Sequence, residues 1–215
     1  MEKQEDETSA SLLRAGICLS ECGLYDEAEA LLSQVRTSEE ALFGTDDVRI
    51  IPILNALATV YYKKGRYDLV EPIAQQALAL EEQLLGLDHP SIGESLHTLA
   101  GAYHRQGRFS EEEPLLLRAL ALRERILGSQ HPDVAMSMNS LANLYNGQGR
   151  YKQAETLYRQ ALAIWQQILG SQRSEVALSL NNLAVLYNRQ ELYEQAEPLA
   201  EQALHIYEQT LGAEA

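Results

Sequence analysis

The sequence predicts an all-α solenoid built from five stacked helix-turn-helix units. Three observations lead to this fold class. The chain repeats itself every 42 residues, each period holds two glycines, and both segments between the glycines carry apolar residues at helical spacing. Such self-similarity is typical of repeat proteins, in which each unit buries its core only against its neighbours.

Two series of glycines set the period and divide each repeat into two segments. Their members are Gly23, Gly65, Gly107 and Gly149, and then Gly44, Gly86, Gly128, Gly170 and Gly212. Glycine tolerates the left-handed conformation that ends many helices, so we expect a helix to stop at each one. His89-Pro90 and His131-Pro132 are expected to open helices, because the first turn needs no proline N–H.

The first segment of each repeat, the A helix, is expected at about 8–22, 48–64, 90–106, 132–148 and 174–190. The second segment, the B helix, is expected at about 25–43, 67–85, 109–127, 151–169 and 193–211. Residues 1–8 are expected to be a flexible acidic N-terminus. Residues 9–215 are expected to be a single array with repeats at about 9–46, 47–88, 89–130, 131–172 and 173–215.

The composition excludes several classes of function. There are 31 acidic residues against 17 basic ones in 215, and the net charge of -14 disfavours nucleic acid and anionic membranes as partners. The richest apolar stretch, 50–62, is interrupted by Pro52 and Asn55 and is shorter than the roughly 20 residues of a spanning helix. With 2 cysteines and no apolar leader, the chain is predicted to be cytoplasmic.

No signature of an enzyme, a cofactor or a metal site occurs in the sequence. It contains no H-E-x-x-H, Walker, G-x-G-x-x-G or G-x-S-x-G motif, so no catalytic residue is predicted. Cys18 and Cys22 lie four residues apart on the first A helix, but they have no third ligand nearby. We expect them to be small core residues.

The A helices carry a polar stripe beside their apolar stripe, and this stripe holds the candidate binding residues. Asparagine is enriched there although it is a poor helix former, roughly 0.6 kcal/mol worse than alanine. Its amide could hold the backbone of an extended peptide, or it could cap or brace neighbouring helices. The predicted peptide-binding residues on this face are Asn55, Tyr62, His97, His104, Asn139, Asn143, Asn146, Asn181, Asn182 and Asn188.

Three basic residues share the next column of the same face. Lys63, Arg105 and Arg189 are predicted either to attract a partly acidic partner or to be solvated charges at helix ends. On the B helices, a glutamate recurs in the first turn at positions 29, 71, 113, 155 and 197, and we interpret it as complementing the helix dipole. Trp165 shares a column with Glu81 and Arg123 and is expected to be partly exposed.

The period alone fits the length of HEAT or armadillo repeats, so the residue pattern decides. Leu54-x-x-Leu57-Ala58-x-x-Tyr61 matches the A helix of a tetratricopeptide repeat (TPR), and Gly16 takes the crossing position in the first repeat. The proline that closes each repeat comes eight residues late, at Pro90 and Pro132. Each B helix has therefore gained about two turns, or about 12 Å.

Four further runs resemble the kinesin light chain repeat. They are 176–187 (VALSLNNLAVLY), 149–155 (GRYKQAE), 161–164 (ALAI) with the later Leu169-Gly170, and 131–134 (HPDV), and the resemblance covers about residues 10–212. It implies a right-handed solenoid of five TPR units with a concave groove, lined by A helices, where peptides bind. It also implies that the ligand is acidic and carries an aromatic anchor.

The predicted function is a non-catalytic scaffold that binds an extended segment of a partner protein in the A-helix groove. An undetected enzyme stays an alternative. A second alternative is a structural module that self-associates through the array ends, because no capping helix is expected after the last repeat. We expect an apolar strip there made of Leu199, Leu204, Ile206 and Leu211.

Overall fold

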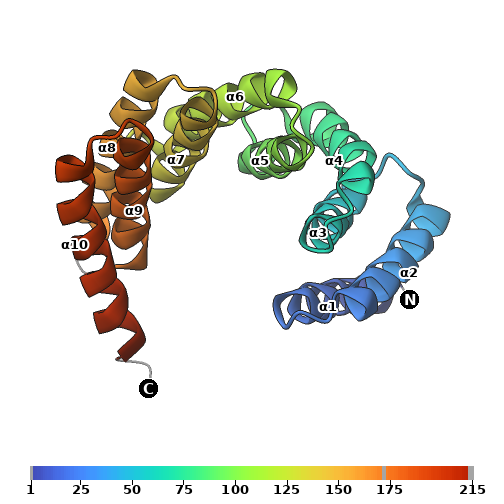
Figure 1. Cartoon of the computed structure of the whole chain (residues 1–215). Helices are drawn as coiled ribbons and strands as arrows, with labels where there is room; N and C mark the ends of the chain where they lie inside the picture. The colour runs from blue at the N-terminus through green and yellow to red at the C-terminus, as the bar shows by residue number, and fades with distance from the viewer. Residues whose placement is uncertain (1, 171–172, 213–215) are drawn as a thin grey trace. The chain divides into compact units, whose positions relative to one another are not determined.

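The computed structural model describes residues 2–170 and 173–212, and its secondary structure there is helical (Figure 1). The described residues form five helix-turn-helix units, which confirms the predicted fold class. The A helices are α1 (Glu2–Glu21), α3 (Ile50–Lys63), α5 (Pro90–Arg105), α7 (Pro132–Gly147) and α9 (Ser174–Arg189). The B helices are α2 (Tyr25–Phe43), α4 (Tyr67–Leu80), α6 (Phe109–Leu127), α8 (Tyr151–Leu169) and α10 (Tyr193–Gly212).

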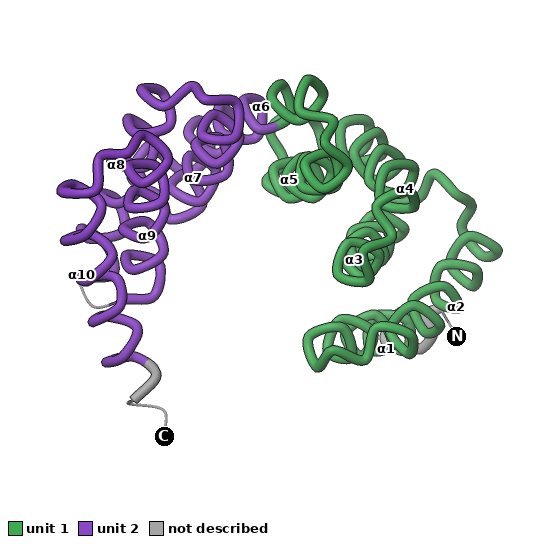
Figure 2. The backbone as a smooth tube through the Cα atoms, in the orientation of Figure 1, with its two compact units in different colours: residues 1–115 green, residues 116–215 purple. Residues whose placement is uncertain are grey.

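The chain divides into two compact units, residues 1–115 and 116–215, and the boundary falls inside α6 (Figure 2). Unit 1 holds α1 to α5 and unit 2 holds α7 to α10. In unit 1 each helix packs on the next one, and among the A helices α1 packs on α3 and α3 packs on α5. In unit 2 α7 packs on α8 and on α9 in the same way. The division into one array of five repeats stays a prediction.

The helix ends agree closely with the sequence prediction, with two differences. Helix α1 begins at Glu2 rather than near residue 8, so the expected flexible N-terminus has helical backbone. The N-terminal segment 1–8 contains glutamate, lysine and glutamine, which are good helix formers. The second B helix changes after Leu80 into a π-helix, η1 (Glu81–Leu85), which the residue pattern does not indicate.

The turn chemistry follows the sequence. His89 and His131 are the N-caps of α5 and α7, where each ring accepts a hydrogen bond from the backbone N–H two residues later, at 3.4 and 3.2 Å. The glycines of both series up to Gly170 have φ between 73° and 90°. The first series would place its next glycine at position 191, but Glu191 stands there with φ 63°.

The core of unit 1 begins where α1 crosses α2. A Cβ atom added to Gly16 would lie 2.6 Å from Leu32 Cδ2, so the predicted close crossing is confirmed. Leu32 is fully buried, together with Leu57 and Val60 of α3. Because α1 turns Leu13 toward this core, Cys18 and Cys22 remain exposed, and the prediction that they are core residues is wrong.

The core of unit 2 gathers around Trp165 of α8. This side chain is 9% exposed and packs with Val134 of α7 and Ile206 of α10, so it is more buried than expected. Ile206 is 1% exposed whereas Leu204 is 58% exposed. The expected apolar strip on α10 is therefore interrupted, and the side chain of Leu211 lies outside the described residues.

No helix in the described part of the chain is both long and apolar enough to cross a membrane.

Candidate peptide-binding site

A cavity of 620 Å³ opens on the A-helix face of unit 1. Its lining comes from α1, α3, η1 and the start of α5, and Figure 1 shows these three A helices following one another along unit 1. The α3 side chains Asn55, Thr59 and Lys63 are spaced by four residues and therefore share one helix face. The cavity thus brings together two of the predicted binding residues, Asn55 and Lys63.

The walls of the cavity are largely apolar. Ile51, Pro52 and Leu85 line it, and Leu85 reaches it from the π-helical turn. At the rim, Ile17 is 39% exposed and Val48 is 47% exposed. Exposed aliphatic side chains at the edge of a hollow are suited to contact with an apolar group of a partner.

The amide of Asn55 is engaged on both sides. Its Nδ2 donates to Glu81 Oε1 at 2.9 Å, and its Oδ1 accepts from Ser95 Oγ of α5 at 3.0 Å. Glu81 is fully buried, and its Oε2 has no hydrogen-bond partner in the described part of the molecule. Asn55 therefore ties α3 to the π-helix and to the next A helix.

The basic column reaches back to the preceding A helix. Lys63 Nζ lies 3.4 Å from Ser20 O, and Arg189 Nη1 donates to Asn146 O at 3.3 Å. Each of these partners lies 43 residues earlier. Tyr62 likewise lies 43 residues before Arg105, and a hydrogen bond to Tyr62 raises the pKa of the Arg105 guanidinium. These cations lie at the C-terminal ends of helices, where the dipole favours positive charge.

In unit 2, the α7 amides Asn139, Asn143 and Asn146 have different surroundings. Asn139 is 8% exposed and donates through Nδ2 to Ser179 Oγ at 3.3 Å, while its Oδ1 has no partner among the described residues. Asn143 Oδ1 accepts a hydrogen bond from the Tyr158 hydroxyl at 2.5 Å. Burial raises the pKa of Tyr158 to about 12, so this hydroxyl stays a donor at neutral pH.

The remaining predicted residues do not form one cluster. Asn181 and Asn188 of α9 are exposed, Asn182 is half-buried, and none of their side-chain amides has a hydrogen-bond partner in the described ranges. His97 is half-buried, and His104 Nδ1 lies 3.0 Å from Glu112 Oε2. Burial raises the pKa of Glu112. No group of three or more His, Cys, Asp or Glu that could hold a metal occurs within 2–170 and 173–212.

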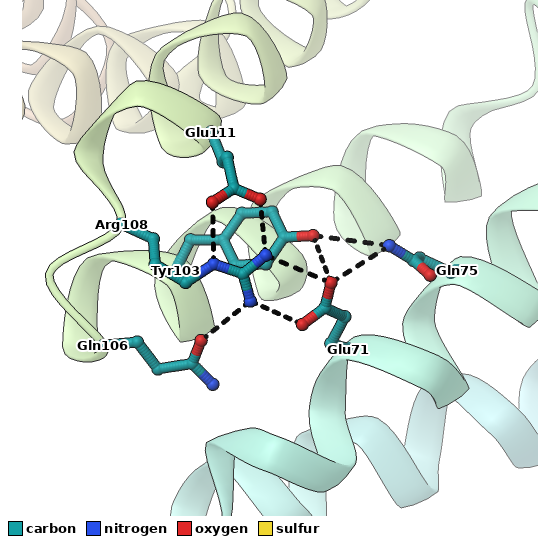
Figure 3. A network of polar contacts seen from close by, with 6 residues as sticks. All are labelled: Glu71, Gln75, Tyr103, Gln106, Arg108 and Glu111. Carbon is teal, nitrogen blue, oxygen red and sulfur yellow. Dashed lines mark hydrogen bonds and ion pairs between the residues drawn. The ribbon is translucent and has the colours of Figure 1, made fainter.

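A polar network joins successive repeats of unit 1 (Figure 3). It includes Glu71, which the sequence pattern led us to interpret only as a charge that complements the helix dipole. Tyr103 of α5 donates to Glu71 Oε1 of α4 at 2.9 Å, and Arg108 Nη1 lies 2.5 Å from Glu71 Oε2. Arg108 also bonds Glu111 and stacks 4.1 Å from the centre of the Tyr103 ring. The hydrogen bond from Arg108 lowers the pKa of Glu71.

The same arrangement recurs in unit 2 with a different cation. Tyr187 donates to Glu155 Oε1 at 2.6 Å, and Arg159 contacts both residues. Glu71 and Glu155 therefore join one B helix to the next A helix, and the interpretation of the repeated glutamates as a dipole charge alone is incomplete. An arginine follows the first glycine series at 66, 108 and 150, and Arg66 and Arg108 each contact the glutamate of the preceding B helix, so this arginine is a signal of the contact in the sequence.

A family model described as a tetratricopeptide repeat matches residues 7–83, 49–125, 113–164 and 133–209. The chain belongs to the tetratricopeptide repeat family. Repeats of this family generally form protein-interaction modules and are typically non-catalytic. None of the curated proteins matches the chain.

Solved structures give the same fold. The nearly identical TPR-like repeats of a candidate kinesin light chain from Podosopora anserina share 27% identity, with a TM-score of 0.78 over 94% of this TPR chain and 95% of that one. BtubC (BKLC) from P. vanneervenii shares 21% identity, with a TM-score of 0.73 over 98% and 92%. A Rap protein complexed with Competence and Sporulation Factor shares 16%, with a TM-score of 0.65 over 95% and 65%. The similarity to the last two proteins shows only that the fold is shared.

Proposed function

We propose that this TPR protein is a non-catalytic, cytoplasmic interaction module that binds an extended segment of a partner protein on its A-helix face. The observation that carries the proposal is the cavity of 620 Å³ on α1, α3 and α5. It is large enough for a bulky side chain, and apolar walls beside a few polar groups are typical of binding sites. Asn55 and Lys63 belong to its lining. A role of the other predicted residues in binding stays a prediction.

Two comparisons support the proposal. TPR domains generally bind proteins, and a Rap protein with the same fold forms a complex with Competence and Sporulation Factor. The alternative, self-association through the last repeat, would rest on Leu204, which is 58% exposed on α10. In that case the mass in solution would rise with concentration, and Leu204→Glu would abolish the rise.

The test is a selection of phage-displayed random dodecapeptides on the purified chain, followed by titration of the enriched peptides. Thr59→Trp fills the cavity mouth, and it removes only a hydrogen bond to the carbonyl of Asn55 in its own helix. We expect this variant to lose at least about tenfold in peptide affinity, which equals about 1.4 kcal/mol.

Thr156→Trp is the matched control. Thr156 is also exposed and also bonds only a carbonyl four residues earlier, that of Lys152 in α8. This variant should bind like the wild type. Failure to enrich any peptide, or equal binding by both tryptophan variants, would contradict the proposed function.

A further inference from the structure

We infer that the segment bound in the unit 1 cavity carries an apolar anchor residue flanked by lysine or arginine. This inference rests on the proposed function and specifies the chemistry of the partner. It departs from the acidic ligand that the sequence resemblance implies.

The first step is the state of the neutral polar groups around the cavity. Both ends of the Asn55 amide are bonded within the protein, to Glu81 and to Ser95. The Thr59 hydroxyl donates a hydrogen bond to the backbone carbonyl of Asn55 in its own helix, and the Ser91 hydroxyl lies 2.8 Å from His89 Nδ1. Each of these groups already has a hydrogen-bond partner within the protein, so we look to the charged groups for the polar part of the site.

The second step is the state of the carboxylates. Glu21 of α1 and Glu94 of α5 both line the cavity and are exposed, and neither carboxylate has a hydrogen bond or ion pair to any described residue. Glu21 is the last residue of α1, whose final turn contains no basic residue. A carboxylate at that end of a helix faces the negative pole of the dipole and is stabilised by a nearby cation.

The third step is the charge balance of the lining. Lys63 is the only lysine or arginine of the lining among the described residues, and its ammonium contacts Ser20 O and Ser20 Oγ. Two carboxylates outweigh this single ammonium. Charge complementarity therefore selects a basic partner residue over an acidic one.

The fourth step is the anchor itself. Ile17 and Val48 expose aliphatic surface at the rim, and Ile51, Pro52 and Leu85 continue it inward. A leucine, isoleucine, methionine or aromatic side chain gains free energy by leaving water for such a surface. Glu21 and Glu94 belong to α1 and α5, so basic residues on either side of the anchor can each meet one carboxylate.

The experiment sequences the peptides enriched on the wild-type chain and titrates them with two double variants. We expect lysine or arginine next to an apolar residue. Glu21→Gln with Glu94→Gln should lower the affinity by about three- to tenfold, since exposed ion pairs contribute up to about 1 kcal/mol each. The affinity should also fall as salt rises. Glu194→Gln with Glu201→Gln, on exposed positions of α10, makes the same change in net charge and should leave the affinity unchanged.

The outcomes separate this inference from the proposed function. Enriched peptides that are acidic, or that bind the Glu21 and Glu94 variant as tightly as the wild type, would overturn the inference. If those peptides still lose affinity to Thr59→Trp, the proposed function stands without it. If Thr59→Trp has no effect, both fall. Thermal unfolding of each variant shows that it is folded before its affinity is compared.

Discussion

Repeats two and four place an asparagine at the same position of the A helix, yet the two amides have different roles. Asn55 is bonded through both its nitrogen and its oxygen, and Asn139 is bonded only through its nitrogen. The difference originates in the B helix. The second repeat offers the carboxylate of Glu81, and the fourth has Trp165 at the equivalent position, which offers no acceptor.

The comparison teaches that a column of identical residues in a repeat protein is not a column of identical functions. Because Glu81 accepts a hydrogen bond from the amide nitrogen of Asn55, the amide oxygen points to Ser95 and accepts the hydrogen bond of its hydroxyl. Without such an acceptor, the Asn139 nitrogen turns to Ser179 and its oxygen remains buried without a partner. The bracing alternative for the asparagines therefore describes Asn55 more closely than Asn139.

The largest effect that would test this comparison is a pair of alanine substitutions. Asn55→Ala leaves the buried Glu81 carboxylate without its donor, so we expect the free energy of unfolding to fall by about 1–3 kcal/mol. Asn139→Ala loses one bond, removes an unpaired buried oxygen and gains about 0.6 kcal/mol of helix propensity, so it should stay within about 1 kcal/mol of the wild type. Urea unfolding followed by circular dichroism measures both.

The double variant Asn55→Ala with Glu81→Leu is the control for this interpretation. Removing the carboxyl group along with its donor should recover part of the loss, because an apolar pair leaves no buried polar group without a partner. Equal losses in the two single alanine variants would show that the B-helix partner does not decide the role of the asparagine.

The sequence was sufficient for the fold because periodic glycines, histidine–proline helix starts and apolar spacing are local signals. It placed Asn55 and Lys63 on the polar face of the A helix, since a helix face follows from spacing alone, and the structure shows that both line the cavity. It could not show that Glu81 lies behind Asn55 or that Lys63 contacts Ser20, because these contacts join separate helices. The π-helical turn that brings Leu85 to the cavity also leaves no signature in residue types.

The comparison of repeats extends to their turns. Gly107 has φ 73° with no atom within 4 Å of an added Cβ, and Glu191 holds φ 63° at the equivalent turn between α9 and α10. A side chain in this left-handed region costs roughly 1–2 kcal/mol, part of which the lower chain entropy of a non-glycine residue offsets. Glu191→Gly should therefore stabilise the protein by about 0.5–1 kcal/mol.

The reverse exchange, Gly107→Glu, sharpens this prediction. It meets no steric obstacle, so its cost should be conformational and similar in size to the gain from Glu191→Gly. Thermal unfolding of both variants measures the two changes. A stabilisation by Gly107→Glu, or a loss of stability on Glu191→Gly, would show that contacts of the side chains outweigh the backbone conformation at these turns.

The smallest expected effects on stability come from the basic column, but there the two units should differ in binding. Lys63→Met removes two contacts to Ser20, and Arg189→Met removes one contact to Asn146, each at the end of the preceding A helix. The carbonyls that lose a contact, Ser20 O and Asn146 O, still accept from the backbone N–H three residues later, at 3.3 and 3.2 Å. Each variant should therefore lose less than about 1 kcal/mol.

Peptide titration then separates the two cations, because only Lys63 lines the cavity of unit 1. Its removal leaves Glu21 and Glu94 without an opposing ammonium, so a peptide flanked by lysine should bind about two- to fivefold more tightly to Lys63→Met. Arg189→Met should bind it like the wild type. If the partner is acidic, the change in affinity should have the opposite sign, and Lys63→Met should bind the peptide more weakly than the wild type. The direction of this one change therefore decides whether the cavity selects its ligand through its carboxylates or through its single ammonium.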